Sequence, residues 1–217
     1  MLNKLKQIKT AFNYKNSPNI GDFAILKSDI LGAKVSPEVT DKLQNVVGYH
    51  PLIDLDKLIE YPEGSFGREY AEHMKRNNLQ SISISPELED IAQRNVFALR
   101  YAVTHDIFHA LLGFDTSYAG EIGVLAFAAA QNYSKSLKIG LWLAKILYPI
   151  AAPQQIKAII ANQRKGKELG RKAKFLLGYR FEKHWDESLN KVREDLGLPQ
   201  IQIPPTPIEK GGLSEAY

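Results

Sequence analysis

The sequence predicts an all-α fold, a single-domain helical bundle over residues 1–198 followed by a Pro/Gly-rich tail over residues 199–217. After Pro86 no proline or glycine occurs before Gly113, and apolar residues in between recur with a period near 3.6. The one alternating segment, residues 81–84, is four residues long, and we expect an extended linker there. With 217 residues, 44% of them hydrophobic and 24% charged, the chain can build one sizeable core.

Capping residues divide the first half into short helices. An amphipathic helix is expected around residues 5–12, in a basic stretch that resembles a transit peptide in charge but lacks arginine. A second helix is expected to start at Asp22, as its N-cap, and to end at Gly32. Serine–proline pairs at residues 36–37 and 85–86 predict two further helix starts, and residues 67–77 predict a short helix between them.

The second half predicts longer helices. Residues 86–112 are expected to form one uninterrupted helix that Gly113 ends. After a loop, Gly120 and Glu121 open a helix that runs through Tyr133. We expect two more helices, over residues 135–148 and from Pro153 to Leu196, the last one bent or divided at Gly178.

Four side chains that commonly bind metals lie within 17 positions: His105, Asp106, His109 and Glu121. Residues four apart on a helix share a face, about 5–6 Å between β-carbons, so His105 and His109 can bind one ion. Asp106, about 100° around the helix from His105, could be a ligand or could orient an imidazole. Glu121 can reach the histidines if the two helices form a hairpin. The set suits a divalent metal, zinc first, with iron, manganese and magnesium as alternatives, and a plain polar patch is the competing interpretation.

Composition excludes several classes of protein. The absence of cysteine excludes disulfides, thiolate zinc sites and cysteine nucleophiles. The most apolar stretch, residues 139–152, is shorter than the roughly 20 residues of a membrane-spanning helix. Nine lysines and arginines lie between Lys157 and Lys183, which suits an anionic membrane, a phosphorylated ligand or a solvated helix face. Nucleic acid is disfavoured as a partner because aromatic residues do not interleave with these charges.

Three blocks of sequence, in order, carry a family resemblance. The first is the segment 62–71, Pro-Glu-Gly-Ser-Phe-Gly-Arg-Glu-Tyr-Ala. The second is His105-Asp106-x-x-His109-x-x-Leu112-Gly113 followed by Gly120-Glu121, and the third runs from Gly170 through Trp185 to Gly197. Over roughly residues 20–200 the chain resembles the coenzyme Q biosynthesis protein four family.

The resemblance implies a helical, metal-binding and membrane-peripheral protein that organises other quinone-biosynthesis enzymes around polyprenyl intermediates. We expect a cytoplasmic protein, and its basic stretch suggests peripheral contact with an anionic membrane. The implied activity is oxidative removal of a ring carboxylate with hydroxylation at that carbon. By position, the resemblance assigns the metal to His105, Asp106, His109 and Glu121. Ala128 stands where an acidic residue is expected after Phe127, which weakens the transfer of the catalytic role. A non-catalytic isoprenoid-binding scaffold is therefore the alternative.

A polyprenyl chain requires an apolar groove between helices, and small residues such as Gly123 and Ala126 would leave room for one. The residues expected to contact the lipid or its head group are Arg68, Tyr70, Phe127, Gln131, Leu141 and Trp142. For each apolar one, an ordinary place in the core is the alternative, and for Arg68 it is an ion pair with Glu72. The segment 137–148 could also rest on lipid or form a homodimer.

Overall fold

The computed structural model describes residues 20–30 and 35–202. All regular structure in these ranges is helical, and the only extended pairing found there is an isolated bridge between Ser65 and Ser188. The all-α prediction is therefore confirmed. The helix expected around residues 5–12, the stop at Gly32 and most of the tail lie outside the described residues.

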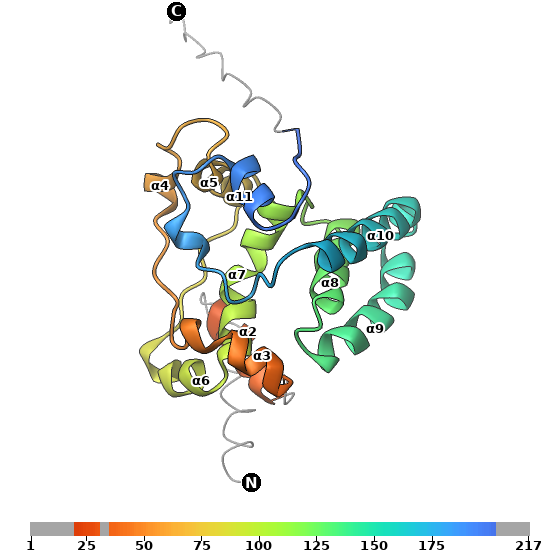
Figure 1. The fold of residues 1–217 in the computed structure, drawn as a ribbon. Coiled ribbons are helices and arrows are strands. Elements are labelled where there is room, and N and C mark those ends of the chain that lie inside the picture. The colour runs from red at the N-terminus through yellow and green to blue at the C-terminus, as the bar shows by residue number, and fades with distance from the viewer. Residues whose placement is uncertain (1–19, 31–34, 203–217) are drawn as a thin grey trace, which may run out of the picture.

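The helices fall into groups around a central one, α7 (Figure 1). Before it come α2 (Ile20–Ile30), α3 (Pro37–Lys42), α4 (Leu55–Leu58), α5 (Phe66–Arg76) and α6 (Glu89–Arg94), with short 3-10 turns at Gln44–Val46 and Pro86–Leu88. Then follow α7 (Val96–Leu112), α8 (Tyr118–Ala130), α9 (Lys135–Ala151), α10 (Ile156–Lys172) and α11 (Leu189–Asp195), with 3-10 turns at Pro153–Gln155 and Phe181–Lys183. In Figure 1, α8, α9 and α10 stand on one side of α7, while α5 and α11 lie near its C-terminal end.

The main hydrophobic core surrounds the C-terminal half of α7. Phe108 is completely buried, and its ring meets Phe127 of α8 at 5.8 Å and Phe181 at 6.0 Å between centroids. Phe66 of α5 in turn meets Phe181 at 6.0 Å. These edge-to-face contacts join segments distant in sequence, so the core fixes α8 against α7.

The helices α8 and α10 touch backbone to backbone. A methyl group on Gly166 would lie 2.1 Å from the carbonyl oxygen of Gly123, and one on Gly170 would lie 2.5 Å from that of Phe127. Small residues permit such close helix packing. The small residues of α8 thus make room for the backbone of α10 at these two contacts.

Two N-terminal predictions were wrong in detail. Residues 86–112 do not form one helix, because Asn95 leaves the helical region (φ −114°, ψ 65°) and its side chain caps α7 by accepting the Ala98 N–H. Asp22 does not cap α2, which begins at Ile20; it is buried and accepts hydrogen bonds from the Ser85 N–H (2.8 Å) and hydroxyl (2.5 Å). Asp22 therefore joins α2 to the start of the 3-10 turn at Pro86–Leu88.

The expected helix from Pro153 to Leu196 was also wrong, because α10 ends at Lys172. The backbone that follows is irregular and wraps around buried Arg100, which donates to the carbonyls of Leu177 (3.4 Å) and Tyr179 (2.9 Å). The helix α9 runs through Pro149, where we expected it to stop. The first tail residues pack against the bundle, since Asn190 exchanges two 2.9 Å hydrogen bonds with Ile201.

Candidate metal centre

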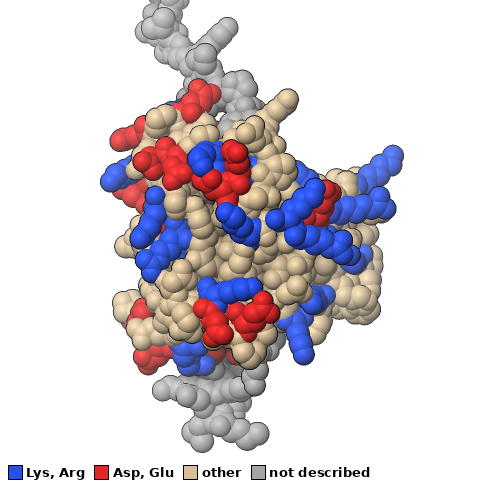
Figure 2. Space-filling view, in the orientation of Figure 1, with Lys and Arg blue, Asp and Glu red and all other residues tan. Residues whose placement is uncertain are grey.

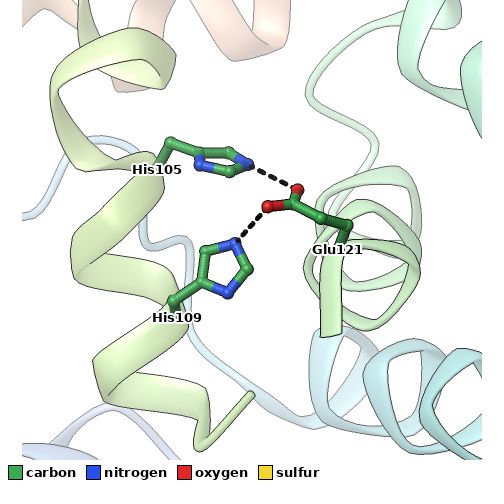
Figure 3. Close-up of side chains that lie close together, drawn as sticks. All are labelled: His105, His109 and Glu121. Carbon is green, nitrogen blue, oxygen red and sulfur yellow. Dashed lines mark ion pairs between the residues drawn. The ribbon is translucent and has the colours of Figure 1, made fainter. Parts of the chain in front are cut away.

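Three of the predicted ligands come together between α7 and α8. His105 and His109 lie one turn apart on α7, and Glu121 is in the first turn of α8 (Figure 3). The Nε2 atom of His105 lies 3.6 Å from one carboxylate oxygen of Glu121, and the Nε2 atom of His109 lies 3.3 Å from the other. One ligand atom from each residue falls within 4.8 Å of the others, so a single ion could be bound by all three.

Local sequence explains this placement. Gly113 adopts the left-handed conformation (φ 70°) and ends α7 as predicted. Ser117 then caps α8 by accepting a hydrogen bond from the Gly120 N–H. Glu121 therefore lies in the first turn of α8, directly after the chain reverses direction. The hairpin that the prediction for Glu121 required is therefore formed.

The hydrogen bonds of His109 determine which nitrogen can bind a metal. Its Nδ1 atom lies 2.9 Å from the carbonyl oxygen of Asp115 and 3.3 Å from that of Phe114. Carbonyl oxygens only accept, so Nδ1 carries the proton and Nε2 presents a lone pair in the neutral ring. That Nε2 is buried and has no hydrogen-bond partner among the residues that the structure describes. A nitrogen lone pair and a carboxylate oxygen 3.3 Å apart repel each other unless a cation, either a proton or a metal ion, lies between them.

Asp106 is not one of the three converging residues. Its carboxylate lies 3.4 Å from Nδ1 of His105, on the ring edge opposite Glu121. Burial opposes a charge on His105, but the hydrogen bond with Asp106 and the negative charges of Glu121 and Asp106 outweigh it and raise the pKa of His105. Asp106 thus takes the place of a carboxylate that orients a ligating imidazole.

Sequence reasoning missed two neighbours of the centre. His73 of α5 stacks on His109, with 5.9 Å between ring centroids and 19° between planes. Burial, followed by the nearness of His109, lowers the pKa of His73 to about 4, so its ring is neutral. The other neighbour is the Asp115 carbonyl, and because a backbone group has no side-chain identity, no residue type could have revealed it.

Four residues predicted to contact lipid have structural partners. Tyr70 is 2% exposed and stacks on Trp185 at 5.4 Å, and Phe127 is completely buried against Phe108. The Gln131 amide donates to the carbonyls of Gly170 (2.7 Å) and Ala173 (3.1 Å), which ties α8 to the end of α10. Arg68 forms the ion pair with Glu72, at 2.9 Å, that we considered as its alternative role.

The other two predicted lipid contacts lie on α9. Leu141 is half-buried and packs on the small cluster between α8, α9 and α10, whereas Trp142 is 62% exposed. Among the described helices, none is both long and apolar enough to cross a membrane.

Comparison with known proteins adds a family to this geometry. Residues 43–202 match the family model described as coenzyme Q (ubiquinone) biosynthesis protein Coq4. The human protein named ubiquinone biosynthesis protein COQ4 homolog, mitochondrial, is 31% identical over 147 residues, which cover 67% of this chain and 55% of that one. The Xenopus tropicalis protein of the same name is 28% identical, over 72% of this chain and 54% of its own length. The chain thus spans about half the length of the curated relatives it matches.

A solved structure agrees with the fold. The crystal structure of a Nostoc punctiforme protein, described as a candidate ubiquinone biosynthesis protein, superposes with a TM-score of 0.61 and 25% identity. The match covers 90% of this chain and 88% of that one. All three converging residues lie inside the matched range 43–202, and the chain belongs to the coenzyme Q (ubiquinone) biosynthesis protein Coq4 family.

Proposed function

We propose that this protein binds a divalent metal and a polyprenyl lipid in quinone biosynthesis, and that it takes part in oxidative decarboxylation and hydroxylation of a prenylated aromatic acid. Family membership supports the pathway. The observation that carries the metal is the buried, unpartnered Nε2 of His109, which faces Glu121 together with His105.

The donor set fits such a metal. Two imidazole nitrogens and a carboxylate suit zinc, and equally iron or manganese, with magnesium as a weaker match. A bound divalent ion would supply Lewis acidity toward a ring carboxylate or a water molecule. Asp106 and the Asp115 carbonyl hold the two imidazoles with Nε2 toward Glu121, and the burial of His109 keeps water from that side. In the alternative with Asp106 as a fourth ligand, its side chain would have to turn away from His105.

Metal analysis of the purified protein tests the centre. We expect about one equivalent of a divalent metal by elemental analysis, lost in His105→Ala/His109→Ala. The matched control is His184→Ala, since His184 also faces a carboxylate, Glu187, but without a second histidine in its cluster. Wild-type protein that is metal-free yet complements a strain lacking the family member would refute the metal role.

A second function, a scaffold that binds isoprenoid lipid at a membrane, is favoured by the surface of α9. Its exposed apolar side chains are Ile139 (61%), Trp142 (62%), Leu143 (44%), Ile146 (47%), Leu147 (56%) and Ile150 (72%). Residues 122–181 also carry eleven lysines and arginines against one acid, Glu168. Figure 2 shows basic side chains gathered over α10, beside this apolar helix. An apolar helix flanked by cations suits a membrane with anionic lipids, and a homodimer through α9 is the competing arrangement.

Flotation with vesicles of 30% anionic lipid at low salt tests the scaffold. We expect the protein to float, and Ile146→Ser/Ile150→Ser to weaken binding severalfold. The matched control is Leu52→Ser, because Leu52 is 83% exposed but belongs to another face. Protein that stays unbound, or a concentration-dependent dimer that the double variant abolishes, would contradict membrane docking.

We place the proposed decarboxylation or scaffold role in the cytoplasm, on a membrane surface with other quinone-biosynthesis enzymes as partners. The animal relatives are named mitochondrial.

A further inference from the structure

A large open pocket adjoins the candidate metal centre, because His105 and Asp106 of α7 both line it. It has a volume of about 820 Å³ and is bounded by α2, by residues 78–83 and by α7 from Tyr101 to Asp106. His105 belongs both to this pocket and to the converging set with Glu121. A molecule bound in the pocket would therefore contact a side chain of the proposed metal centre.

The charges in the pocket suit an anion. Among the described residues that line it, the only lysine or arginine is Lys27 of α2, and the only carboxylate is that of Asp106, which is turned toward His105. Lys27 is exposed and makes no ion pair with any residue in the ranges 20–30 and 35–202, while the nearby acid Asp29 pairs with Arg94 at 2.7 Å. The ammonium of Lys27 is thus available for an anionic ligand.

Size and wall chemistry narrow the class of ligand. A volume of this order takes an organic molecule and is far too large for an inorganic anion alone. The walls combine the flat side chain of Tyr101 and the apolar side chains of Ala24, Leu79 and Ile82 with the amides of Asn78 and Gln80. Such mixed walls suit an aromatic ring with hydroxyl or carbonyl substituents.

We propose that this pocket binds the head ring of an aromatic carboxylic acid and that Lys27 recognises its carboxylate beside the metal centre. The inference rests on the proposed function, in that it names the part of the substrate that meets the metal site. Any prenyl chain would leave through the open side of the pocket. Lys27 is here a specificity residue and takes no part in bond making.

A comparison of charged and neutral probes isolates the ion pair. The probes are 3,4-dihydroxybenzoate and 3,4-dihydroxybenzamide, which share shape and hydroxyls but differ in charge. Calorimetry or NMR titration gives the ratio of their dissociation constants for the wild type and for Lys27→Met, Lys27→Arg and Lys57→Met. Lys57 of α4 is the matched control, since it is exposed, forms no ion pair with any residue that the structure describes and does not line the pocket.

We expect the preference for the benzoate to fall by about threefold to fivefold in Lys27→Met, the range of a solvent-exposed ion pair. Lys27→Arg and Lys57→Met should keep it. An unchanged preference in Lys27→Met, no binding of either probe, or equal displacement by inorganic phosphate would overturn the proposal. Any effect of bound metal on the ratio of dissociation constants is the same in all variants, so it cancels when the variants are compared. If elemental analysis finds no metal but the preference for the benzoate still depends on Lys27, the proposed metal is refuted and the proposed pocket is supported. If metal is found but the preference does not depend on Lys27, only the pocket proposal is refuted.

Discussion

The contact between α8 and α10 can be tested with one substitution, Gly166→Ala. The added methyl group would lie 2.1 Å from the Gly123 carbonyl oxygen and 2.9 Å from its carbon. A carbon and a carbonyl oxygen normally stay about 3.3 Å or more apart, so the helices must separate locally by about 1 Å. Both clashing atoms of α8 are backbone, and no change of rotamer can relieve the contact.

The matched control is Gly140→Ala on α9, where a methyl group would meet no atom within 4 Å. Both variants gain about 1 kcal/mol of helix propensity, so their difference isolates the steric cost. Overpacking costs about 1–3 kcal/mol, and backbone contact places Gly166→Ala near the upper end. Gly140→Ala should be more stable than the wild type, and Gly166→Ala less stable.

Urea unfolding followed by circular dichroism, with chelator present, gives both free energies of unfolding. For a chain of this length, about 1 kcal/mol corresponds to roughly 2–4 °C in melting temperature. Glu121 lies two residues before Gly123, so Gly166→Ala should also weaken metal binding, whereas Gly140→Ala should not. Equal stability of the two variants, within about 0.5 kcal/mol, would refute the backbone contact.

Three further predictions concern stability. Asn95→Ala removes the cap of α7 and should cost about 1 kcal/mol in urea unfolding. Arg100→Met leaves Glu182 buried without its 3.3 Å partner and should cost about 3–5 kcal/mol, part of which Glu182→Gln restores; no recovery would argue against the pair. Because the folded pKa of His73, about 4, lies below the ordinary 6.5, the unfolded state binds more protons, and the chelated protein should lose up to about 3 kcal/mol between pH 6.5 and 4. His73→Phe should show a smaller loss over that interval, and an identical pH profile would refute the burial of a neutral ring.

The sequence predicted the helices and their stops best where local signals act alone. Gly113 ends α7 because a left-handed residue is needed there, and the i, i+4 spacing puts His105 and His109 on one face. The prediction was wrong for the segment after Lys172, where the sequence pattern is helical but a residue far away in the chain binds the backbone. Arg100, 77 and 79 positions earlier, donates to carbonyls that a helix would have used internally. A buried arginine in an apolar helix gives no sign of which backbone it will bind.

The same distinction separates the ligands of the candidate site from the groups that hold them. The three converging residues could be predicted because metal chemistry restricts the residue types, and a hairpin was the one assumption needed. Among the groups around them, Asp106 was predicted as a residue that could orient an imidazole, and it lies beside Nδ1 of His105. The other two could not be predicted, since the Asp115 carbonyl acts through its backbone and His73 stacks on His109 from another helix. Glu121 depends on a still more distant feature. It stands on α8, which Gly123 and Gly166 allow to pack closely against α10, so glycines with no ligating atom help to fix the third candidate ligand. A variant of these glycines that weakens metal binding would therefore report on the geometry of the centre without changing any of its donors.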